Sequence, residues 1–270
     1  MATLRVFCDE SGNLPTADSE LPFLACAIAT LGIMPDMNRV RKNPQDLATS
    51  LKARNSGVGM AYVVPSNGFS NALATKLNKL DTMIRMARLL DAAPGVYPTR
   101  NPRNHIWVQC MSQAIGQAIV QALPQGTIDS MEIVLDQKTL PSRMTAEIDD
   151  LARSLPDEVS ASLSRAREDL PRSAAFVAGL FRLRRDAVTL RWSDEPGVDD
   201  NSNGLRVAHC LANYGRRTVR GRLAVPINEL LTQAGIGCSF IDVTAKVIGD
   251  LPEDFVEDWK ARTGLPEPGA

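Results

Sequence analysis

Apolar residues recur in three short runs near the start of the chain, and each run ends at a turn-forming residue. Residues 4–8 run into Asp-Glu-Ser-Gly, residues 21–31 are almost unbroken up to Gly32, and residues 58–64 stop at Pro65. Runs of this length with such boundaries are typical of buried β-strands. Three strands in succession indicate an antiparallel meander.

The pattern then changes to helical spacing, with apolar positions every three or four residues over 71–90 and 105–123. Apolar runs at 131–135, which closes on Asp136, and at 187–192 predict two further strands. Five further segments have helical patterns of varying strength, and they are predicted to be helices: 141–155, 158–167, 204–217, 227–233 and 253–262. The pattern leaves 174–183 open between strand and helix, and 35–56 open between loop and short helix.

This order of elements predicts an α/β fold. A meander that continues into strands joined by helical crossovers gives a mixed sheet with helices on both faces. The predicted sheet has five strands. We expect one domain over residues 1–218 and a C-terminal helical extension over 219–270 that packs on the same domain.

Composition places few further limits on the protein. Its 270 residues are 44% hydrophobic and 23% charged, which is typical of a soluble globular protein. The net charge of −1 provides no global field that would favour nucleic acid or a membrane. Two regions are locally basic, and each is either a solvated face or a phosphate-binding patch. They contain Arg172, Arg182, Arg184, Arg185 and Arg191, and Arg216, Arg217, Arg220 and Arg222.

The five cysteines are scattered and include no CxxC pair, so they predict neither a disulfide framework nor a structural zinc site. Buried thiols in a reducing cytoplasm are the simplest interpretation. No apolar run reaches the roughly 20 residues of a membrane span, so we expect no membrane association. Walker A, GxSxG, HExxH and Rossmann glycine motifs are also absent from the sequence.

The chemistry is concentrated where the first strand ends, at Asp9-Glu10-Ser11-Gly12. A rigid strand aims the side chains that follow it, and Gly12 permits a backbone conformation that bulkier residues resist. Strand alternation directs Asp9 and Glu10 to opposite faces, so only one of them easily serves a given site. The alternative interpretation is a strand-terminating turn without further function.

This run resembles the opening motif of the DUF3800 family, whose fold is ribonuclease H-like. The resemblance covers the chain to about residue 217. It implies that carboxylates from the first strand, the fourth strand and the last core helix hold divalent ions against a phosphodiester. Asp9 and Asp136 occupy the first two positions. Such sites use Mg²⁺ or Mn²⁺, because hard oxygen ligands suit these ions.

The third position departs from the family pattern. The family's late helix resembles Leu-Gln-x-Ala-Asp, whereas residues 205–209 read Leu-Arg-Val-Ala-His. His209 therefore stands at the Asp position, as a metal ligand, as a general acid or base, or as a structural residue. Arg206, three residues earlier on the same helix face, fits phosphate recognition but would also repel a metal ion.

The resulting prediction is a divalent-metal-dependent nuclease or phosphodiesterase that acts on DNA or RNA, in a prokaryotic mobile-element or phage-conflict context. The alternative is an inactive ribonuclease H-like scaffold that binds nucleic acid or a protein partner. The sequence also leaves open whether the protein forms a homodimer. The candidate catalytic residues are Asp9, Asp136, His209 and Glu10, and the candidate metal ligands are Asp9, Asp136 and His209. The candidate substrate contacts are Ser11, Arg206, Asn213 and Lys138. The acids Asp194, Glu195, Asp199 and Asp200 are possible substitute ligands, and His105 is expected to be structural.

Overall fold

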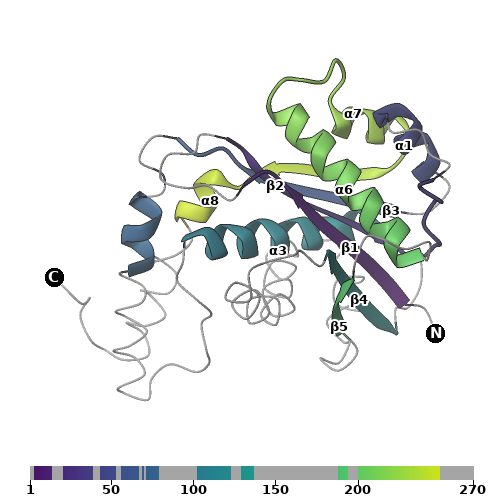
Figure 1. The fold of residues 1–270 in the computed structure, drawn as a ribbon, viewed down its shortest axis with the longest axis horizontal. Coiled ribbons are helices and arrows are strands. Elements are labelled where there is room, and N and C mark those ends of the chain that lie inside the picture. Colours follow the sequence, from purple (N-terminus) through teal and green to yellow (C-terminus); the bar gives the residue numbers. More distant parts are fainter. Residues whose placement is uncertain are drawn as a thin grey trace.

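The computed structural model describes residues 3–13, 21–38, 43–52, 56–66, 69, 71–78, 102–122, 129–136, 188–193 and 200–249. This part of the chain forms an α/β fold (Figure 1). Its strands are β1 (Thr3–Ser11), β2 (Phe23–Thr30), β3 (Ser56–Val63), β4 (Ser130–Asp136), β5 (Val188–Ser193) and β6 (Gly237–Asp242). Its labelled helices are α1 (Pro44–Leu51), α3 (Pro102–Ala122), α6 (Asp200–Val219), α7 (Ile227–Gln233) and α8 (Thr244–Gly249).

One mixed sheet contains all the described strands, in the order β5-β4-β1-β2-β3-β6. β2 runs antiparallel to both β1 and β3, which confirms the predicted meander. β4 is parallel to β1, and β5 is parallel to β4. β1 is therefore a central strand with partners on both sides, and its C-terminal end lies beside the C-terminal end of β4.

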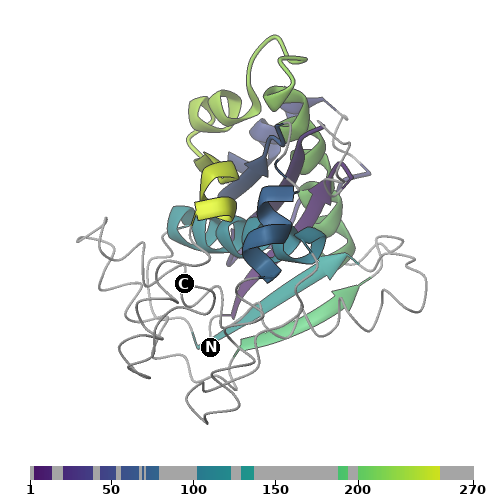
Figure 2. The ribbon, with the colours of Figure 1, turned by 90° about the vertical axis from the view of Figure 1, so that its left-hand side faces the viewer.

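Helices cover both faces of the sheet, as predicted (Figures 1 and 2). α3, α8 and the helical residues 71–78 pack on one face, and α1, α6 and α7 pack on the other. Alternate residues of β1 supply the two cores, because successive side chains of a strand point to opposite faces. Val6 and Cys8 face α3, whereas Phe7 faces α6.

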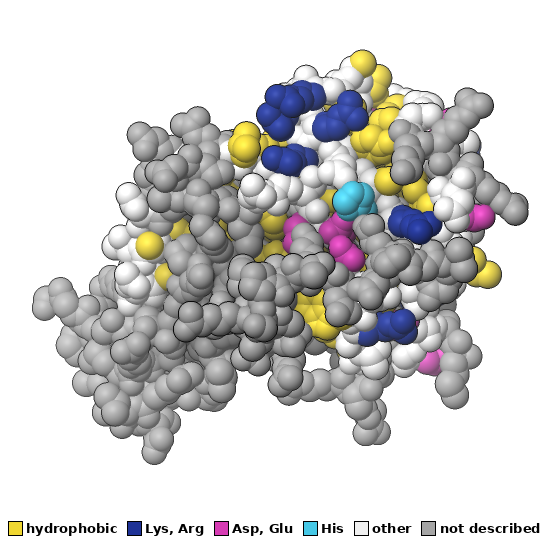
Figure 3. All heavy atoms as spheres, in the orientation of Figure 1, with side chains coloured by type: hydrophobic (Ala, Val, Ile, Leu, Met, Phe, Trp, Pro, Cys, Tyr) yellow, Lys and Arg dark blue, Asp and Glu magenta, His cyan; other side chains and the backbone are white. Residues whose placement is uncertain are grey.

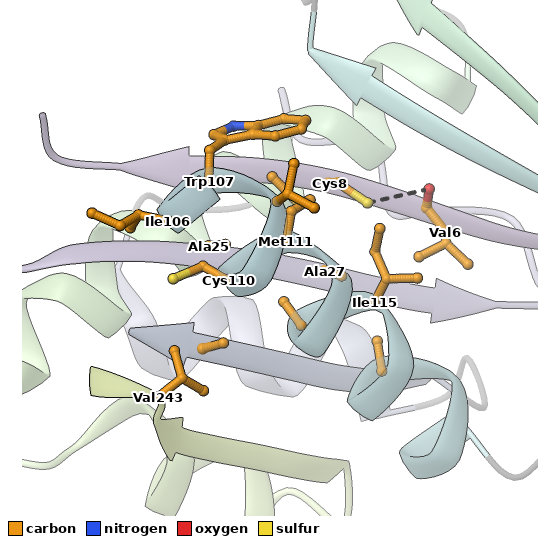
Figure 4. Close-up of a cluster of buried hydrophobic side chains, with 14 of the residues drawn as sticks. Val6, Cys8, Ala25, Ala27, Ile106, Trp107, Cys110, Met111, Ile115 and Val243 are labelled. Carbon is orange, nitrogen blue, oxygen red and sulfur yellow. Dashed lines mark hydrogen bonds between the residues drawn. The ribbon is translucent and has the colours of Figure 1, made fainter. Parts of the chain in front are cut away.

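Small residues let α3 lie directly on the sheet (Figure 4). A Cβ added to Gly59 would stand 2.0 Å from the carbonyl oxygen of Ala114, and one added to Gly57 would stand 2.0 Å from the amide nitrogen of Ala122. No side chain fits at these distances, so the two glycines of β3 set how closely α3 packs. Ala114, Ala118 and Ile115 are fully buried in this layer.

The segment at 35–56, which the pattern left open, contains α1. Asn43 caps this helix, because its Oδ1 accepts a hydrogen bond from the amide N–H of Asp46 at 2.8 Å. The Asn43 amide group in turn donates to Asp46 Oδ2 at 2.8 Å, and Pro44 stands in the first turn. Local capping chemistry therefore determines where α1 begins.

β6 was not predicted. It pairs in parallel with β3, so the described sheet has six strands and the predicted count of five is wrong. The strand also lies in the segment that was predicted to be a helical extension. Its six residues read GCSFID and are only partly buried, which gives a weak period-2 signal. The hydrogen bonds of an exposed β3 edge, and not a local pattern, make this segment a strand.

Some predicted elements lie outside the described residues: the helices at 141–155, 158–167 and 253–262, the segment 174–183 and the second half of the helix at 71–90. The predicted helix at 227–233 is confirmed with the same bounds as α7. None of the described helices combines the length and hydrophobicity that a membrane span requires.

His105 lies in α3 and is hydrogen-bonded to the backbone of Val247 in α8. Burial lowers the pKa of His105 to about 4 from its ordinary value of 6.5, and the hydrogen bond only partly opposes this shift. At pH values between about 4 and 6.5, the unfolded chain therefore binds a proton at His105 that the folded protein does not bind. This supports the structural role that the sequence predicts for His105.

We expect the free energy of unfolding to fall by about 2 kcal/mol between pH 7 and pH 5 through His105 alone. The contribution is complete above the unfolded pKa and is lost as the pH falls towards the folded pKa. Urea unfolding of wild type and His105→Gln at both pH values measures it. The variant should lose about 2 kcal/mol less than wild type over this interval. Equal losses in the two proteins would show that His105 is not buried in its neutral form.

Candidate functional site

Asp9 lies at the C-terminal end of β1 on the α6 face of the sheet, one pleat beyond Phe7. Its side chain is 2% exposed. One carboxylate oxygen, Oδ1, accepts a hydrogen bond of 2.7 Å from the amide N–H of Glu10. A buried carboxylate requires further donors, because burial of an unpaired charge is costly. The second oxygen obtains its donor from α6.

α6 lies directly on β1 because residue 204 has no side chain. A Cβ added to Gly204 would stand 2.4 Å from the Phe7 ring. Near the other end of α6, a Cβ on Gly215 would stand 2.8 Å from Met60 Sδ. The predicted apolar face of the helix is buried between these two contacts: Leu205, Ala208, Leu211 and Ala212.

His209 projects from α6 towards the end of β1, and its Nδ1 lies 2.7 Å from Asp9 Oδ2. Asn213, one turn later, places its Nδ2 2.9 Å from His209 Nε2. The Ser11 hydroxyl donates to Asn213 Oδ1 at 2.8 Å. Four side chains from β1 and α6 thus form one continuous hydrogen-bonded chain, Asp9–His209–Asn213–Ser11.

The direction of these bonds defines one tautomer. Asp9 as a carboxylate only accepts, so Nδ1 of His209 carries the proton. The Asn213 amide group then donates to an unprotonated Nε2, and its carbonyl oxygen accepts from Ser11. With His209 neutral, each of the three bonds in this chain joins one donor to one acceptor. The His209 side chain is 49% exposed, so it can meet a ligand from solvent.

Asp136 ends β4 next to Asp9. The register pairs Cys8 with Leu135, so Asp9 and Asp136 are the next residues on two parallel strands about 4.8 Å apart. Val134 belongs to the same core as Phe7, which places Asp136 on the α6 face with Asp9. The register therefore places Asp136 at the strand end next to Asp9, whose carboxylate contacts the imidazole of His209.

Arg206 is fixed by the segment that follows β2. Its Nη1 donates to Asn38 Oδ1 at 3.1 Å. The same segment is attached to α6 a second time, because the Met37 amide N–H donates to Asn203 Oδ1 at 3.2 Å. Arg206 is thus positioned by contacts that bridge 168 residues of sequence.

Gly12 has a φ of +103°, which confirms the prediction that Gly12 adopts a backbone conformation that bulkier residues resist. Space is also restricted there, because an added Cβ would stand 2.7 Å from the Pro22 carbonyl oxygen and 3.0 Å from Arg216 Nε. The turn after Ser11 therefore runs between Pro22, the residue before β2, and the Arg216 side chain of α6.

Glu10 points to the opposite face of the sheet from Asp9, as strand alternation requires. Its backbone N–H contacts Asp9, but the structure does not bring its side chain together with Asp9 and His209. Asp200 is the first residue of α6. Lys138, Asp194, Glu195 and Asp199 lie outside the described residues.

Cysteine chemistry has no support at this corner. Burial raises the pKa of the Cys8 thiol, and the negative charges of Asp9 and Glu10 raise it further. Cys8 also faces α3 and not α6. The five cysteines are free thiols, of which Cys8, Cys26 and Cys110 are buried.

The side chains at this corner are of chemical types that bind divalent ions such as Mn²⁺. Carboxylates suit Mg²⁺ and Mn²⁺, and an imidazole favours Mn²⁺ over Mg²⁺. Their arrangement is not that of a closed site, because the described residues contain no group of three or more His, Cys, Asp or Glu side chains that could hold an ion. Asp9 and His209 are instead hydrogen-bonded to each other.

Asn38 and Asn203 were not predicted as part of the site. Neither belongs to a motif, and both contribute through contacts between the segment after β2 and α6. A local pattern contains no signal for such pairs. Arg216 could be foreseen only as a member of the same helix face.

No protein-family model matches this chain, and neither a curated protein nor a solved structure matches it significantly.

We expect His209→Ala to lower the free energy of unfolding by about 1–3 kcal/mol, because Asp9 would lose a donor while remaining buried. Chemical denaturation measures the loss. Arg217→Ala on the exposed side of the same helix is the matched control, with an expected change within about 0.5 kcal/mol. In an Asp9→Asn background, His209→Ala should cost less than in wild type. An equal cost in both backgrounds would contradict the Asp9–His209 coupling.

Proposed function

We propose that this chain is a divalent-metal-dependent nuclease or related phosphodiesterase, with a ribonuclease H-like fold of the DUF3800 type. The observation that carries the proposal is the contact of 2.7 Å between Asp9 of β1 and His209 of α6, beside Asp136 of β4. These are the three elements from which the resemblance expects the ligands to come.

The topology supports the fold part of the proposal. A three-stranded antiparallel meander is followed by β4 and β5, which extend the sheet in parallel from β1. Helices lie on both faces, and α6 is the last helix before the C-terminal segment. β6 is then an addition at the β3 edge of a five-stranded arrangement.

Asp9, Asp136 and His209 are the residues that would hold an ion, and a bound divalent ion would supply Lewis-acid activation of the phosphodiester. The Asp9–His209 hydrogen bond must open for both side chains to become ligands. Ser11 and Asn213 hold the imidazole ring in one orientation, and Arg206 offers a planar donor to phosphate oxygens. Each of these side chains is anchored to a strand or a helix, which limits its freedom.

The reaction adds water across a P–O bond. The water oxygen forms a bond to phosphorus, and the bond to the 3′ oxygen breaks. One water proton passes to a base, and the leaving oxygen takes up a proton. As the alternative to metal ligation, with its bond to Asp9 closed, His209 is suited to this proton transfer, because Asp9 then fixes its tautomer and the His209 side chain is 49% exposed.

A second function is favoured by a specific observation. His209 uses both ring nitrogens in hydrogen bonds within the protein, to Asp9 and Asn213. An inactive scaffold that binds nucleic acid or a protein partner would preserve such a network without a metal. Metal binding distinguishes the two functions. A role in prokaryotic mobile-element or phage conflict follows from the resemblance alone.

We expect Mn²⁺ at about one hundred times its dissociation constant to stabilise the wild type by about 2.7 kcal/mol relative to EDTA. For a chain of this size the thermal midpoint should rise by about 5–10 °C. Mg²⁺ should act more weakly, because one ligand is an imidazole. Asp9→Asn and Asp136→Ala should lose the shift, as measured by thermal melts in EDTA, Mg²⁺ and Mn²⁺.

Glu132→Gln is the matched control for these melts. Glu132 lies on β4 on the same face as Asp136, but it pairs with Arg191 at 3.2 Å away from the site. This variant should keep the full Mn²⁺ shift. If neither ion stabilises the wild type, the metallonuclease is excluded and the inactive scaffold remains. If the shift is present, Mn²⁺-dependent cleavage of DNA and RNA oligonucleotides should disappear in Asp9→Asn and persist in Glu132→Gln.

A further inference from the structure

Four arginines gather at the C-terminal end of α6. Arg216 and Arg217 lie in its last turn, and Arg220 and Arg222 lie in the turn that follows. Figure 3 shows basic side chains over this end of α6, on the same face as an exposed histidine that lies beside acidic side chains. The basic surface and the candidate site therefore open to the same side of the molecule.

The backbone folds these arginines together. Gly221 has a φ of +61° and donates its amide N–H to the Thr218 carbonyl at 2.9 Å, while the Arg222 amide N–H donates to the Arg217 carbonyl at 2.8 Å. These two bonds form a Schellman motif, which reverses the chain at the helix end. The reversal returns Arg222 to the last turn of α6. Partial desolvation, and then the charges of Arg222 and Arg216, lower the pKa of Arg220.

The cluster is not neutralised within the described part of the protein. None of the four arginines forms an ion pair with a described carboxylate. Arg217 lies 5.9 Å from the centre of the Tyr214 ring. The Nε atom of Arg216 is buried beside the turn at Gly12 and has no hydrogen-bond partner. Positive charges held together without acids favour a polyanionic ligand.

The cluster is also aligned with the candidate site. His209, Asn213, Arg216 and Arg220 follow one another at intervals of four, three and four residues, so they form a single stripe along α6. The seven residues from His209 to Arg216 correspond to about 10 Å of helix. At the axial rise of about 3.4 Å per nucleotide in a B-form duplex, this distance corresponds to about three nucleotides of one strand.

We infer that α6 forms a nucleic-acid-binding track, in which the phosphodiester backbone extends from the Asp9–His209 corner to the arginines at 216, 217, 220 and 222. The inference rests on the proposed function, because it assigns the flanking phosphates of the same substrate. Interaction of last-turn arginines with the helix dipole accounts for Arg216 and Arg217, but not for Arg220 and Arg222 beyond the helix.

Binding of a fluorescent single-stranded oligonucleotide of about ten nucleotides, in EDTA so that cleavage does not interfere, tests the track. Anisotropy titrations over a series of salt concentrations give the slope of log K against log salt. Each phosphate contact contributes about 0.7 to this slope for single strands. The triple variant Arg217→Gln, Arg220→Gln, Arg222→Gln should therefore reduce the slope by about 2. DNA and RNA oligonucleotides are compared in parallel.

Arg191→Gln is the matched control, since Arg191 is an exposed arginine paired with Glu132 on the β5 side of the sheet. It should leave the slope unchanged. Thermal melts check that each variant is folded, and Arg222→Gln alone, at an exposed position, should reduce the slope by about 0.7.

Three results are decisive. A slope reduced in the arginine variants and unchanged in Arg191→Gln supports the track. Wild-type binding with the same slope in every variant overturns the track and leaves the proposed function intact. A wild type that binds no oligonucleotide overturns the track and the proposed function together.

Discussion

The contact of α6 with β1 is the constraint on which the candidate site depends. Gly204 meets the Phe7 ring at a distance that leaves no room for a Cβ, so α6 lies closer to β1 here than any residue with a side chain would allow. This approach brings His209 to 2.7 Å from Asp9. A larger residue at 204 would move the helix outward, and the buried Asp9 carboxylate would lose His209 as a donor. The hydrogen bond between Asp9 and His209 therefore depends on the close packing of α6 against β1 at Gly204.

The electrostatic arrangement follows from the same helix. Its buried face is apolar, and its exposed stripe passes from the carboxylates at one end of β1 to the arginines beyond its last turn. The acidic corner and the basic end are different electrostatic environments on one helix, and the proposed nucleic-acid track depends on that difference. An almost neutral chain can therefore have a strongly polar face, because net charge does not describe where charges lie.

Much of the candidate site could be predicted. Asp9, Asp136 and His209 were named from a strand end, a second strand end and a helix motif, and the structure places Asp9 in contact with His209 and Asp136 at the neighbouring strand end. Glu10 was named with them, and alternation along β1 separates it from them. The spacing of four residues on α6 allows Asn213 to reach His209, but the Ser11–Asn213 and Asp9–His209 bonds could not be derived, since each joins residues about 200 positions apart.

The sequence alone determined the elements with strong periodicity and strong boundaries: the meander, α3, β4, α6 and α7. It determined them because the apolar period and the Gly, Pro and Asn positions act within a few residues. The tertiary structure decided the pairing of β6 with β3, the depth at which α6 packs and the contact of His209 with Asp9. Those features depend on which sheet edge is open and on which residues lack a side chain at a contact, and neither is a local property of the chain.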